Sequence, residues 1–314
     1  MTTTPPTAAE PPYLTALDGY PIVVGPFRHL AAERERLSAL QWKHFHAKRV
    51  GTSLGAEISG VDLHPSLDEA VIAEIRHALH EYKVLFFRDQ NMTGTQHAAV
   101  AGLFGDLEVH PVLAKSGDKD TLVRFEKNAG ISGVENLWHH DVTWRPQPSM
   151  AAMLHAVTVP DIGGDTLFSD MYAAYDALDA QTKNQIDDLY AVHDFTHAFG
   201  AHVDADQAAE MRATHPPVRH PVVCTHAATG RKHLYVNRAF VSHFEGWGRE
   251  ASLELLDRLC RLADYPEHQV RFTWTDDAVA FWDNRAVQHY AASDYWPQVR
   301  IMERASIIGP RPVR

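Results

Sequence analysis

Cysteine is almost absent from this sequence, which has only Cys224 and Cys260 among its 314 residues. Two thiols at that spacing match no metal-binding pattern and build no disulfide framework, so we expect reduced, partly buried thiols in the cytosol. Long apolar runs are also missing, because none approaches the roughly 18 residues that a membrane span needs. The start, MTTTPPTAAEPPY, lacks the basic residues and the apolar stretch of a signal peptide. These absences predict a cytoplasmic protein that does not cross a membrane.

Basic residues are too few for a nucleic-acid-binding surface. Lysine and arginine number 29 against 40 acidic residues, and the formal net charge is -11. Binding to a phosphate backbone depends on many positive charges, so we expect no nucleic-acid partner. A small anion is not excluded, because the local field of a pocket decides its binding rather than the total charge.

The chain divides into an N-terminal extension over residues 1–47, whose Pro- and Thr-rich start we expect to be disordered, and one domain over 48–314. Ser66 and Glu69 predict a capping box that opens an amphipathic helix, and Thr93 with Gln96 predicts the start of a second helix. After these, short β-branched or aromatic runs between Gly, Pro and Asp turns predict strands: TLVRF, MAAMLHAV, VRHPVVCTH, KHLYVN, QVRFTW, AVAFW and VRIMERASII. Many short strands with flanking helices predict a mainly β (α+β) fold, a sandwich or jelly roll.

The stretch NLWHHDVTW, residues 136–144, places two histidines beside an aspartate. In a strand, residues i and i+2 share a face, so His139 and Asp141 can converge while His140 points away. One imidazole and one carboxylate make two-thirds of the facial triad that holds non-haem Fe(II). In a chain with 21 histidines, however, an H-x-D pattern also arises by chance, so a purely structural role stays open.

The segment from Ala280 to Ile307 contains the best candidates for a complete site. We expect His289 to follow a buried strand, and Arg300 and Arg304 to share one face of a later strand. Arginines inside a β-sandwich are costly unless each meets an anion, and the guanidinium fork suits a carboxylate or a sulfonate. The alternative is an edge strand whose arginines lie in water.

From about residue 51 to 309, the chain resembles the Fe(II)/2-oxoglutarate-dependent dioxygenases of the taurine dioxygenase (TauD/TfdA) family. Six motifs occur in the family's order: KVLFFRDQ, FGDLEVHPV, WHHDVTW, GGDTLFSDMYAAYDAL, HPVVCTHAATGRKHLYVN and WDNRAVQHYAASDYWPQVRIMERASI. The resemblance implies a double-stranded β-helix, a cupin-like jelly roll. It also implies a cytoplasmic dioxygenase that uses Fe(II), 2-oxoglutarate and O2 to hydroxylate a small anionic organic substrate, releasing succinate and CO2.

The resemblance assigns roles to individual residues. His139, Asp141 and His289 match the iron ligands, Thr166 matches the threonine that binds the C1 carboxylate of 2-oxoglutarate, and Arg300 matches the arginine that pairs with its C5 carboxylate. On the substrate side, the matching residues are His110 and Arg304, which clamp an anion, and Phe199, Phe240 and Trp282, which line the pocket. Core packing is an equally plain role for Trp282.

The same comparison puts taurine itself in doubt as the substrate. Leu113 stands where a tyrosine is expected and Ala198 where a serine is expected, while an asparagine of the family falls at Glu135, next to Asn136. The more apolar wall favours a larger anion, such as an alkyl sulfate ester, a longer sulfonate or an aryloxyalkanoate.

Three rival functions remain at this point. The same iron site serves hydroxylation or desaturation in natural-product or amino-acid biosynthesis. A Zn(II) hydrolase also uses two histidines and an aspartate, but it leaves Thr166 and Arg300 without a purpose. The third rival is a non-catalytic anion binder on the same fold. Family members form dimers or tetramers, which by analogy implies a homo-oligomer.

Overall fold

The computed structural model describes residues 25–110, 121–133, 135–199 and 204–314. Its helices are α1 His29–Ser38, α2 Glu69–Tyr82, α3 Gly94–Gly102, α4 Met171–Asp176, α5 Ala180–Ile186, α6 Phe195–Phe199, α7 Ala205–Thr214 and α8 Arg249–Cys260. Its strands are β1 His46–Arg49, β2 Ala56–Ser59, β3 Val84–Phe87, β4 Leu122–Lys127, β5 Ser149–Thr158, β6 Thr166–Asp170, β7 Tyr190–His193, β8 Val218–Pro221, β9 Val223–Thr225, β10 Lys232–Leu234, β11 Val241–Phe244, β12 Gln269–Phe272, β13 Val279–Asp283, β14 Val287–Ala291 and β15 Arg300–Ile308.

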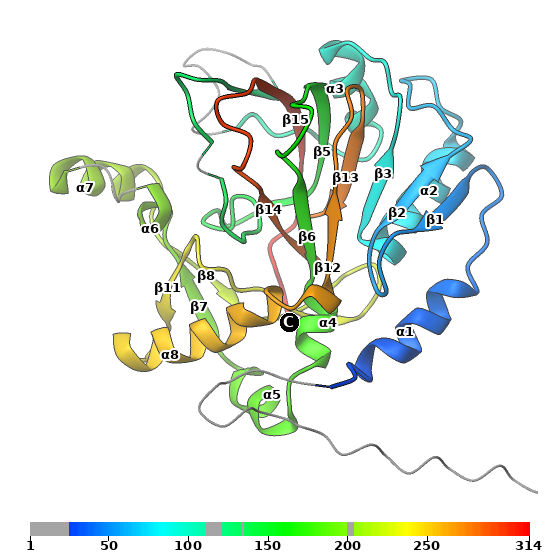
Figure 1. Cartoon of the computed structure of the whole chain (residues 1–314). Coiled ribbons are helices and arrows are strands. Elements are labelled where there is room, and N and C mark those ends of the chain that lie inside the picture. Colours follow the sequence, from blue (N-terminus) through cyan, green and yellow to red (C-terminus); the bar gives the residue numbers. More distant parts are fainter. Residues whose placement is uncertain (1–24, 111–120, 134, 200–203) are drawn as a thin grey trace, which may run out of the picture.

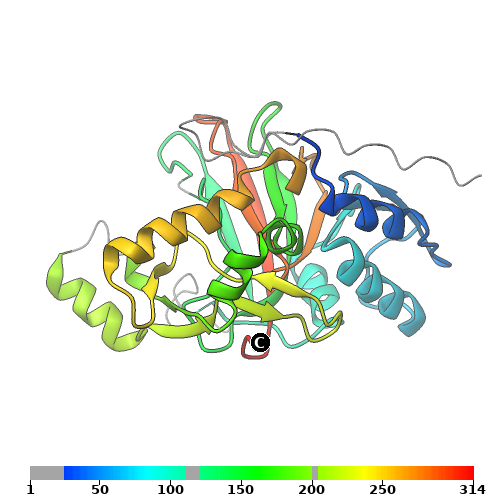
Figure 2. The ribbon, with the colours of Figure 1, turned by 90° about the horizontal axis from the view of Figure 1, so that it is seen from below.

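Two sheets form the centre of the molecule. The larger one has the order β1-β2-β3-β13-β5-β15-β4, and the smaller one has the order β12-β6-β14. Apolar side chains from both sheets, including Phe86, Phe168, Trp282 and Met302, form one buried cluster. Helices α1 and α2 lie on one side of these sheets and α6 to α8 on the other (Figures 1 and 2). The core between the two sheets is therefore where strand alternation delivers inward-facing side chains.

Strand β15 lies inside the larger sheet, since it pairs with β5 along one edge and with β4 along the other. Arg300, Met302 and Arg304 are buried on one face of it, and Ile301 and Glu303 are partly exposed on the other. The predicted alternation is thus present, and the alternative of an edge strand with both arginines in water is excluded.

The local predictions differ in outcome. Thr93 and Gln96 do form a capping box at the start of α3. The predicted box at Ser66 is wrong, because α2 begins at Glu69 after the N-cap residue Asp68, and the Ser66 hydroxyl bonds the His64 ring instead. The strands β9 and β10, which fall in two of the predicted strand runs, pair as an antiparallel hairpin. Cys224 and Cys260 are both buried free thiols, as the sequence predicts.

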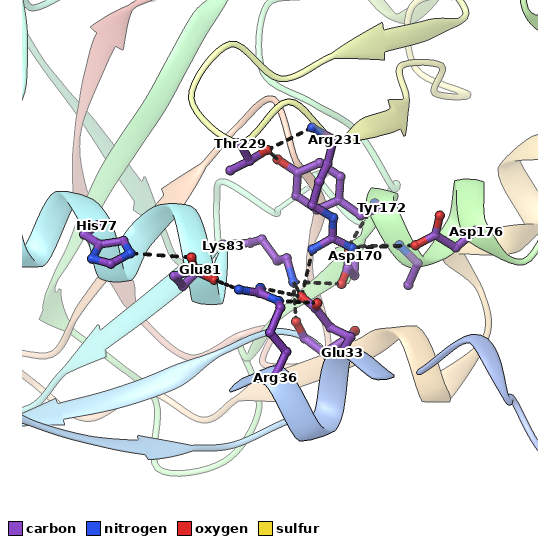
Figure 3. Close-up of polar contacts among 12 residues, drawn as sticks. Glu33, Arg36, His77, Glu81, Lys83, Asp170, Tyr172, Asp176, Thr229 and Arg231 are labelled. Atoms are coloured by element: carbon purple, nitrogen blue, oxygen red, sulfur yellow. Dashed lines mark hydrogen bonds and ion pairs between the residues drawn. The ribbon is translucent and has the colours of Figure 1, made fainter. Parts of the chain in front are cut away.

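The expected leader falls on residues 1–24, outside the described residues. From residue 25 onward the N-terminal segment packs on the domain, since β1 pairs with β2 and Glu33 of α1 reaches a buried lysine. The Lys83 ammonium is fully buried and lies 2.7 Å from the Glu33 carboxylate and 3.4 Å from that of Asp170 (Figure 3). Arg231 also donates to Glu33, at 2.8 Å. This ion network fastens α1 to α4 and to the sheet.

None of the helices in the described residues combines the length with the apolar character that crossing a bilayer requires.

Candidate active site

A cavity opens between the larger sheet and β14 of the smaller one, and most of the residues predicted for the site surround it. It is lined by Phe125, Lys127, Glu135, His139, Leu154, Thr166, Trp282, His289, Ala291, Ser293, Tyr295, Arg300, Met302 and Arg304. Strands β4, β5, β6, β13, β14 and β15 each contribute at least one of these side chains. The lining is apolar on one part, with Phe125, Leu154 and Met302, and positively charged on another.

Two histidines and an aspartate converge at this cavity. One potential ligand atom from each of His139, Asp141 and His289 lies within 4.8 Å of the others. The Asp141 carboxylate is 3.7 Å from Nε2 of His139 and 3.8 Å from Nε2 of His289. The two imidazole rings have centroids 4.2 Å apart. Three donors so close together, without a hydrogen bond between the rings, form a typical arrangement for binding one metal ion.

The backbone explains how His139 and His289 come together. Their main chains form an isolated antiparallel bridge, in which the His139 amide donates to the His289 carbonyl at 3.1 Å and the reverse bond is 2.9 Å. His289 follows the buried strand β13, as expected, and it lies within the next strand, β14.

Asp141 is not in a strand, so the strand predicted through this segment is wrong. It begins a turn in which Val142 has φ of 49°. The side chain of Asn284 fixes this turn, since its Oδ1 accepts from the Asp141 amide at 2.8 Å and its Nδ2 donates to the Asp141 carbonyl at 3.1 Å. His140 does point elsewhere, and its buried ring packs on Tyr235. The sequence reasoning missed Asn284, although it lies inside the motif WDNR.

The protonation states of the three groups suit a divalent metal. Burial would raise the pKa of Asp141, but the Arg304 guanidinium holds it well below its usual range, so the carboxylate is ionised. Burial is the main cause that lowers the pKa of His289 to about 3, so its imidazole is neutral at neutral pH. An ionised carboxylate and a neutral imidazole are the forms that coordinate Fe(II).

Arg304 faces the same cavity and contacts a triad residue directly. Its Nη1 lies 2.9 Å from both carboxylate oxygens of Asp141. Its Nε is buried without a hydrogen-bond partner among the described residues. Arg304 therefore balances the charge of Asp141 and still has donor capacity for a further anion.

Arg300 lies four residues before Arg304 on the same face of β15, and one of its N–H donors has no partner among the described residues. Its Nε donates to the Gly164 carbonyl at 3.1 Å, while one terminal nitrogen, Nη2, is buried without a partner in the part of the chain that the structure describes. Gly164 has φ of 72°, and a Cβ there would lie 3.0 Å from the Arg300 side chain, so both its conformation and its space require glycine. A buried, unpaired guanidinium N–H is expensive, which points to an anionic ligand.

Thr166 and Trp282 also line the cavity. The Thr166 hydroxyl oxygen accepts a hydrogen bond from Trp274 Nε1 at 3.0 Å, so its own hydrogen remains available to a ligand. The Trp282 ring lies 4.9 Å from the His289 ring, measured between centroids, and its indole Nε1 is buried without a hydrogen-bond partner in the described chain.

The remaining residues predicted for the substrate are not among those that line this cavity. His110 is buried, and its pKa is lowered to about 4, chiefly by burial and then by the charge of Arg304; it is not among the residues that line the cavity. Phe199 and Phe240 contact each other, with ring centroids 6.1 Å apart, and they are absent from the lining residues. Phe240 belongs to an apolar cluster that includes Val142, the residue after Asp141. Leu113 lies outside the described residues.

Glu135, rather than Asn136, faces the cavity. Its carboxylate lies 2.8 Å from the Lys127 ammonium, and both residues line the cavity. Asn136 is exposed and lines a separate surface hollow beside Trp138. The sequence reasoning had not assigned Lys127 a role, and the signal for it is its position at the end of β4, opposite Arg300.

The fold and these side chains define a class of protein: a two-sheet β-fold with a 2-His-1-carboxylate site, typical of non-haem iron oxygenases. Comparison with known proteins gives the family. The chain belongs to the taurine catabolism dioxygenase TauD, TfdA family, whose model matches residues 46–306. This confirms the family, the jelly-roll fold and the enzyme class, a 2-oxoglutarate-dependent dioxygenase, that the sequence predicts.

Individual relatives agree with this assignment. The chain is 33% identical to an alkylsulfatase of Acinetobacter baylyi over 82% of each chain. It is 35% identical to an alpha-ketoglutarate-dependent sulfate ester dioxygenase of Pseudomonas putida, over 84% of this chain and 89% of the relative. Among solved structures, a taurine dioxygenase described as putative, from Burkholderia xenovorans, superposes with a TM-score of 0.75 at 34% identity, covering 86% of this chain and 94% of that one.

Proposed function

We propose that this chain is a non-haem Fe(II)- and 2-oxoglutarate-dependent dioxygenase that hydroxylates a small organic anion of the alkyl sulfate ester class. The observation that carries the proposal is the placement of Arg300 and Arg304 on one face of β15, in the cavity that His139 and His289 line. The reaction needs two anions, a dicarboxylate cosubstrate and a substrate, and the cavity offers a separate guanidinium for each.

The residues present fit Fe(II). His139, Asp141 and His289 would hold it, because they offer two imidazole nitrogens and one ionised carboxylate from one side of the cavity. When bound, iron and 2-oxoglutarate supply the oxidation itself, in which O2 is consumed, 2-oxoglutarate becomes succinate and CO2, and a C–H bond of the substrate becomes C–OH. Asn284 holds the turn that carries Asp141, and Arg304 keeps that carboxylate ionised.

For the cosubstrate, we assign Arg300 to the distal carboxylate of 2-oxoglutarate and Thr166 to the carboxylate at the other end. Arg300 has a buried donor without a partner among the described residues, and a planar guanidinium forms paired hydrogen bonds with a carboxylate. The contact between Arg300 and Gly164 orients the guanidinium before the ligand arrives.

Replacing Arg300 by glutamine should raise the KM for 2-oxoglutarate by roughly 10- to 100-fold and change kcat less. The physical reason is that a hydrogen bond to a charged group contributes about 1.5–3 kcal/mol. Initial rates of succinate release at varied 2-oxoglutarate measure this, with the exposed Arg219→Gln as the matched control. An unchanged KM for 2-oxoglutarate would exclude this role for Arg300.

For the substrate, Arg304 supplies the positive charge, and Phe125, Leu154 and Met302 supply an apolar wall. This combination suits an anionic head group on an alkyl chain better than a short zwitterion such as taurine. Hydroxylation of the carbon beside a sulfate ester oxygen yields an unstable adduct that separates into an aldehyde and sulfate. The two relatives that act on sulfate esters by name support this choice over a sulfonate or an aryloxyalkanoate.

A panel of anions tests the substrate class. Medium-chain alkyl sulfates should stimulate succinate release more than taurine, alkylsulfonates or aryloxyacetates do, and Arg304→Ala should remove this stimulation while the slow release without substrate persists. If Arg304→Ala abolishes both, Arg304 acts by positioning Asp141 and not as the clamp. If no anion stimulates turnover while 2-oxoglutarate still binds, the substrate belongs to a biosynthetic pathway.

We place this activity in the cytoplasm, where 2-oxoglutarate is available and where the free thiols of Cys224 and Cys260 stay reduced. A homo-oligomer is proposed by analogy with the family alone.

A further inference from the structure

A second group of metal-ligand side chains lies on the opposite face of the larger sheet. It consists of His97 from α3, His155 from β5 and Glu303 from β15, and one potential ligand atom of each lies within 4.8 Å of the others. Glu303 and His155 are direct partners across the two strands, so their side chains share a face. Helix α3, which carries His97, packs on these two strands. Glu303 points away from the cavity that its neighbour Arg304 lines.

His97 is held in the form that binds metal. Its ring is completely buried, and its Nε2 lies 3.1 Å from the main-chain carbonyl of Met153. A carbonyl only accepts hydrogen bonds, so Nε2 carries the hydrogen and Nδ1 keeps a lone pair. That Nδ1 has no hydrogen-bond partner among the described residues. Burial lowers the pKa of His97 to about 3, so the lone pair is not taken by a proton at neutral pH.

His155 is also buried, with 2% exposed, and neither of its ring nitrogens has a hydrogen-bond partner among the described residues. Its Nε2 faces the Asp277 carboxylate at 3.5 Å. In metal sites, a ligating histidine usually donates its other ring N–H to a carbonyl or a carboxylate, which fixes the tautomer and the ring orientation. Met153 occupies this position for His97, and Asp277 is the carboxylate that faces His155.

Glu303 completes the group and opens it to solvent. Its side chain is 16% exposed, and its Oε1 accepts from Arg124 at 2.7 Å, which orients the carboxylate. Gly94, the first residue of α3, makes room for the other oxygen, since a Cβ at that position would lie 3.2 Å from Glu303 Oε2. Glu303 is therefore the partly exposed member of the group, and the two imidazoles are the buried members.

We propose that His97, His155 and Glu303 form a second metal site, separate from the active site, that binds Zn²⁺ and fastens α3 to the sheet. Two neutral imidazoles and one carboxylate make a known zinc donor set, with water as the fourth ligand. Unlike a packed pair of core histidines, this group has two buried nitrogen lone pairs that no hydrogen bond in the described chain satisfies. A bound cation satisfies both at once.

Zinc stoichiometry tests the proposal without relying on activity. The sample is the full chain with any affinity tag removed and with the substitution Asp141→Asn, which weakens metal binding at the active site. It is dialysed against Zn²⁺ and analysed for bound metal. We expect one equivalent of Zn²⁺ to remain bound and to raise the Tm of the protein. Glu303→Gln should lower the affinity for Zn²⁺ by at least the 10- to 100-fold that the loss of an outer partner of a metal ligand costs. Asp277→Asn should lower it within that range. Glu126→Gln, an exposed glutamate on neighbouring β4, should leave it unchanged.

Three results would overturn the site. The first is no zinc bound in the Asp141→Asn chain, and the second is an equivalent that survives Glu303→Gln with its affinity unchanged. The third is an equal loss in Glu126→Gln, which would assign the binding to surface charge. Because Glu303 and Asp277 are both partly exposed, their substitution leaves the core intact, and circular dichroism confirms the fold of each variant.

Discussion

Replacing His289 by alanine removes 2-oxoglutarate-dependent succinate release, with a loss of more than about 100-fold. Loss of a residue that only hydrogen-bonds a metal ligand lowers metal affinity or activity by up to about 100-fold, and loss of the ligand itself should lower it more. His289 is also part of the bridge that positions His139, since each backbone amide of the pair donates to the carbonyl of the other. The ring, however, makes no side-chain hydrogen bond that would hold the strand, because its Nδ1 has no partner in the described chain. The variant should therefore keep its fold and lose its metal.

Iron content after reconstitution and the rate of succinate release measure this together. Asn136→Ala is the matched control, because Asn136 lies only three residues before His139 but is exposed and outside the cavity. A His289→Ala chain that retains both iron and activity would contradict the assignment of the three ligands. A chain that retains iron and loses activity would leave His289 a role in the reaction but not in binding the metal.

Lys83→Met should lower the free energy of unfolding by about 3–5 kcal/mol, the range for breaking a buried ion pair by removing one partner. Lys83 is fully buried and faces two carboxylates, those of Glu33 and Asp170. Glu33 keeps Arg36 and Arg231 as partners when the lysine is removed. Asp170 caps α4 through one carboxylate oxygen, and its other oxygen has no hydrogen-bond partner among the described residues. The substitution therefore removes the cation that faces the second oxygen of a buried carboxylate, and Arg231 is the positive charge that remains near Asp170.

Urea unfolding followed by circular dichroism measures this loss. Lys48→Met on the exposed side of β1 is the control and should change stability by no more than about 0.5 kcal/mol. A Lys83→Met chain as stable as the wild type would show that the network carries no net stabilisation. In that case α1 is held by its apolar residues, Leu30 and Leu37, alone.

Strand alternation was the most reliable guide in the sequence, and its success depended on context. It predicted correctly that Arg300 and Arg304 share a buried face, because β15 is a regular strand inside a sheet. It was wrong about a strand through Asp141, because Asn284, more than a hundred residues away in the chain, fixes a turn there. Similarly, the Ser66 capping box failed because Ser66 bonds the nearby His64 ring. A pattern read from neighbouring residues cannot include a partner as distant as Asn284.

Contacts between distant segments were beyond the sequence. The pairing of Arg304 with Asp141 and that of Glu135 with Lys127 depend on which strands are neighbours. No local sequence pattern predicts that β13 lies between β3 and β5 in the sheet. The family resemblance supplied the roles of the aligned residues, but it gave no sign of His97 and His155, which match none of its functional motifs. Their meeting became visible only when α3 was seen to pack on β5 and β15.

The two-faced character of β15 makes this strand intolerant of insertions and deletions. Loss of one residue between Ile301 and Arg304 would rotate every later side chain to the other face, because the side-chain period of a strand is two. If Met302 were lost, Glu303 would enter the cavity and Arg304 would leave it. Ala305 and Ile307 would leave the apolar cluster that they form with residues of α2 and α3. The length of this one strand thus fixes which residues face each side of the sheet. Variation in this enzyme should therefore appear here as substitutions and not as changes in length.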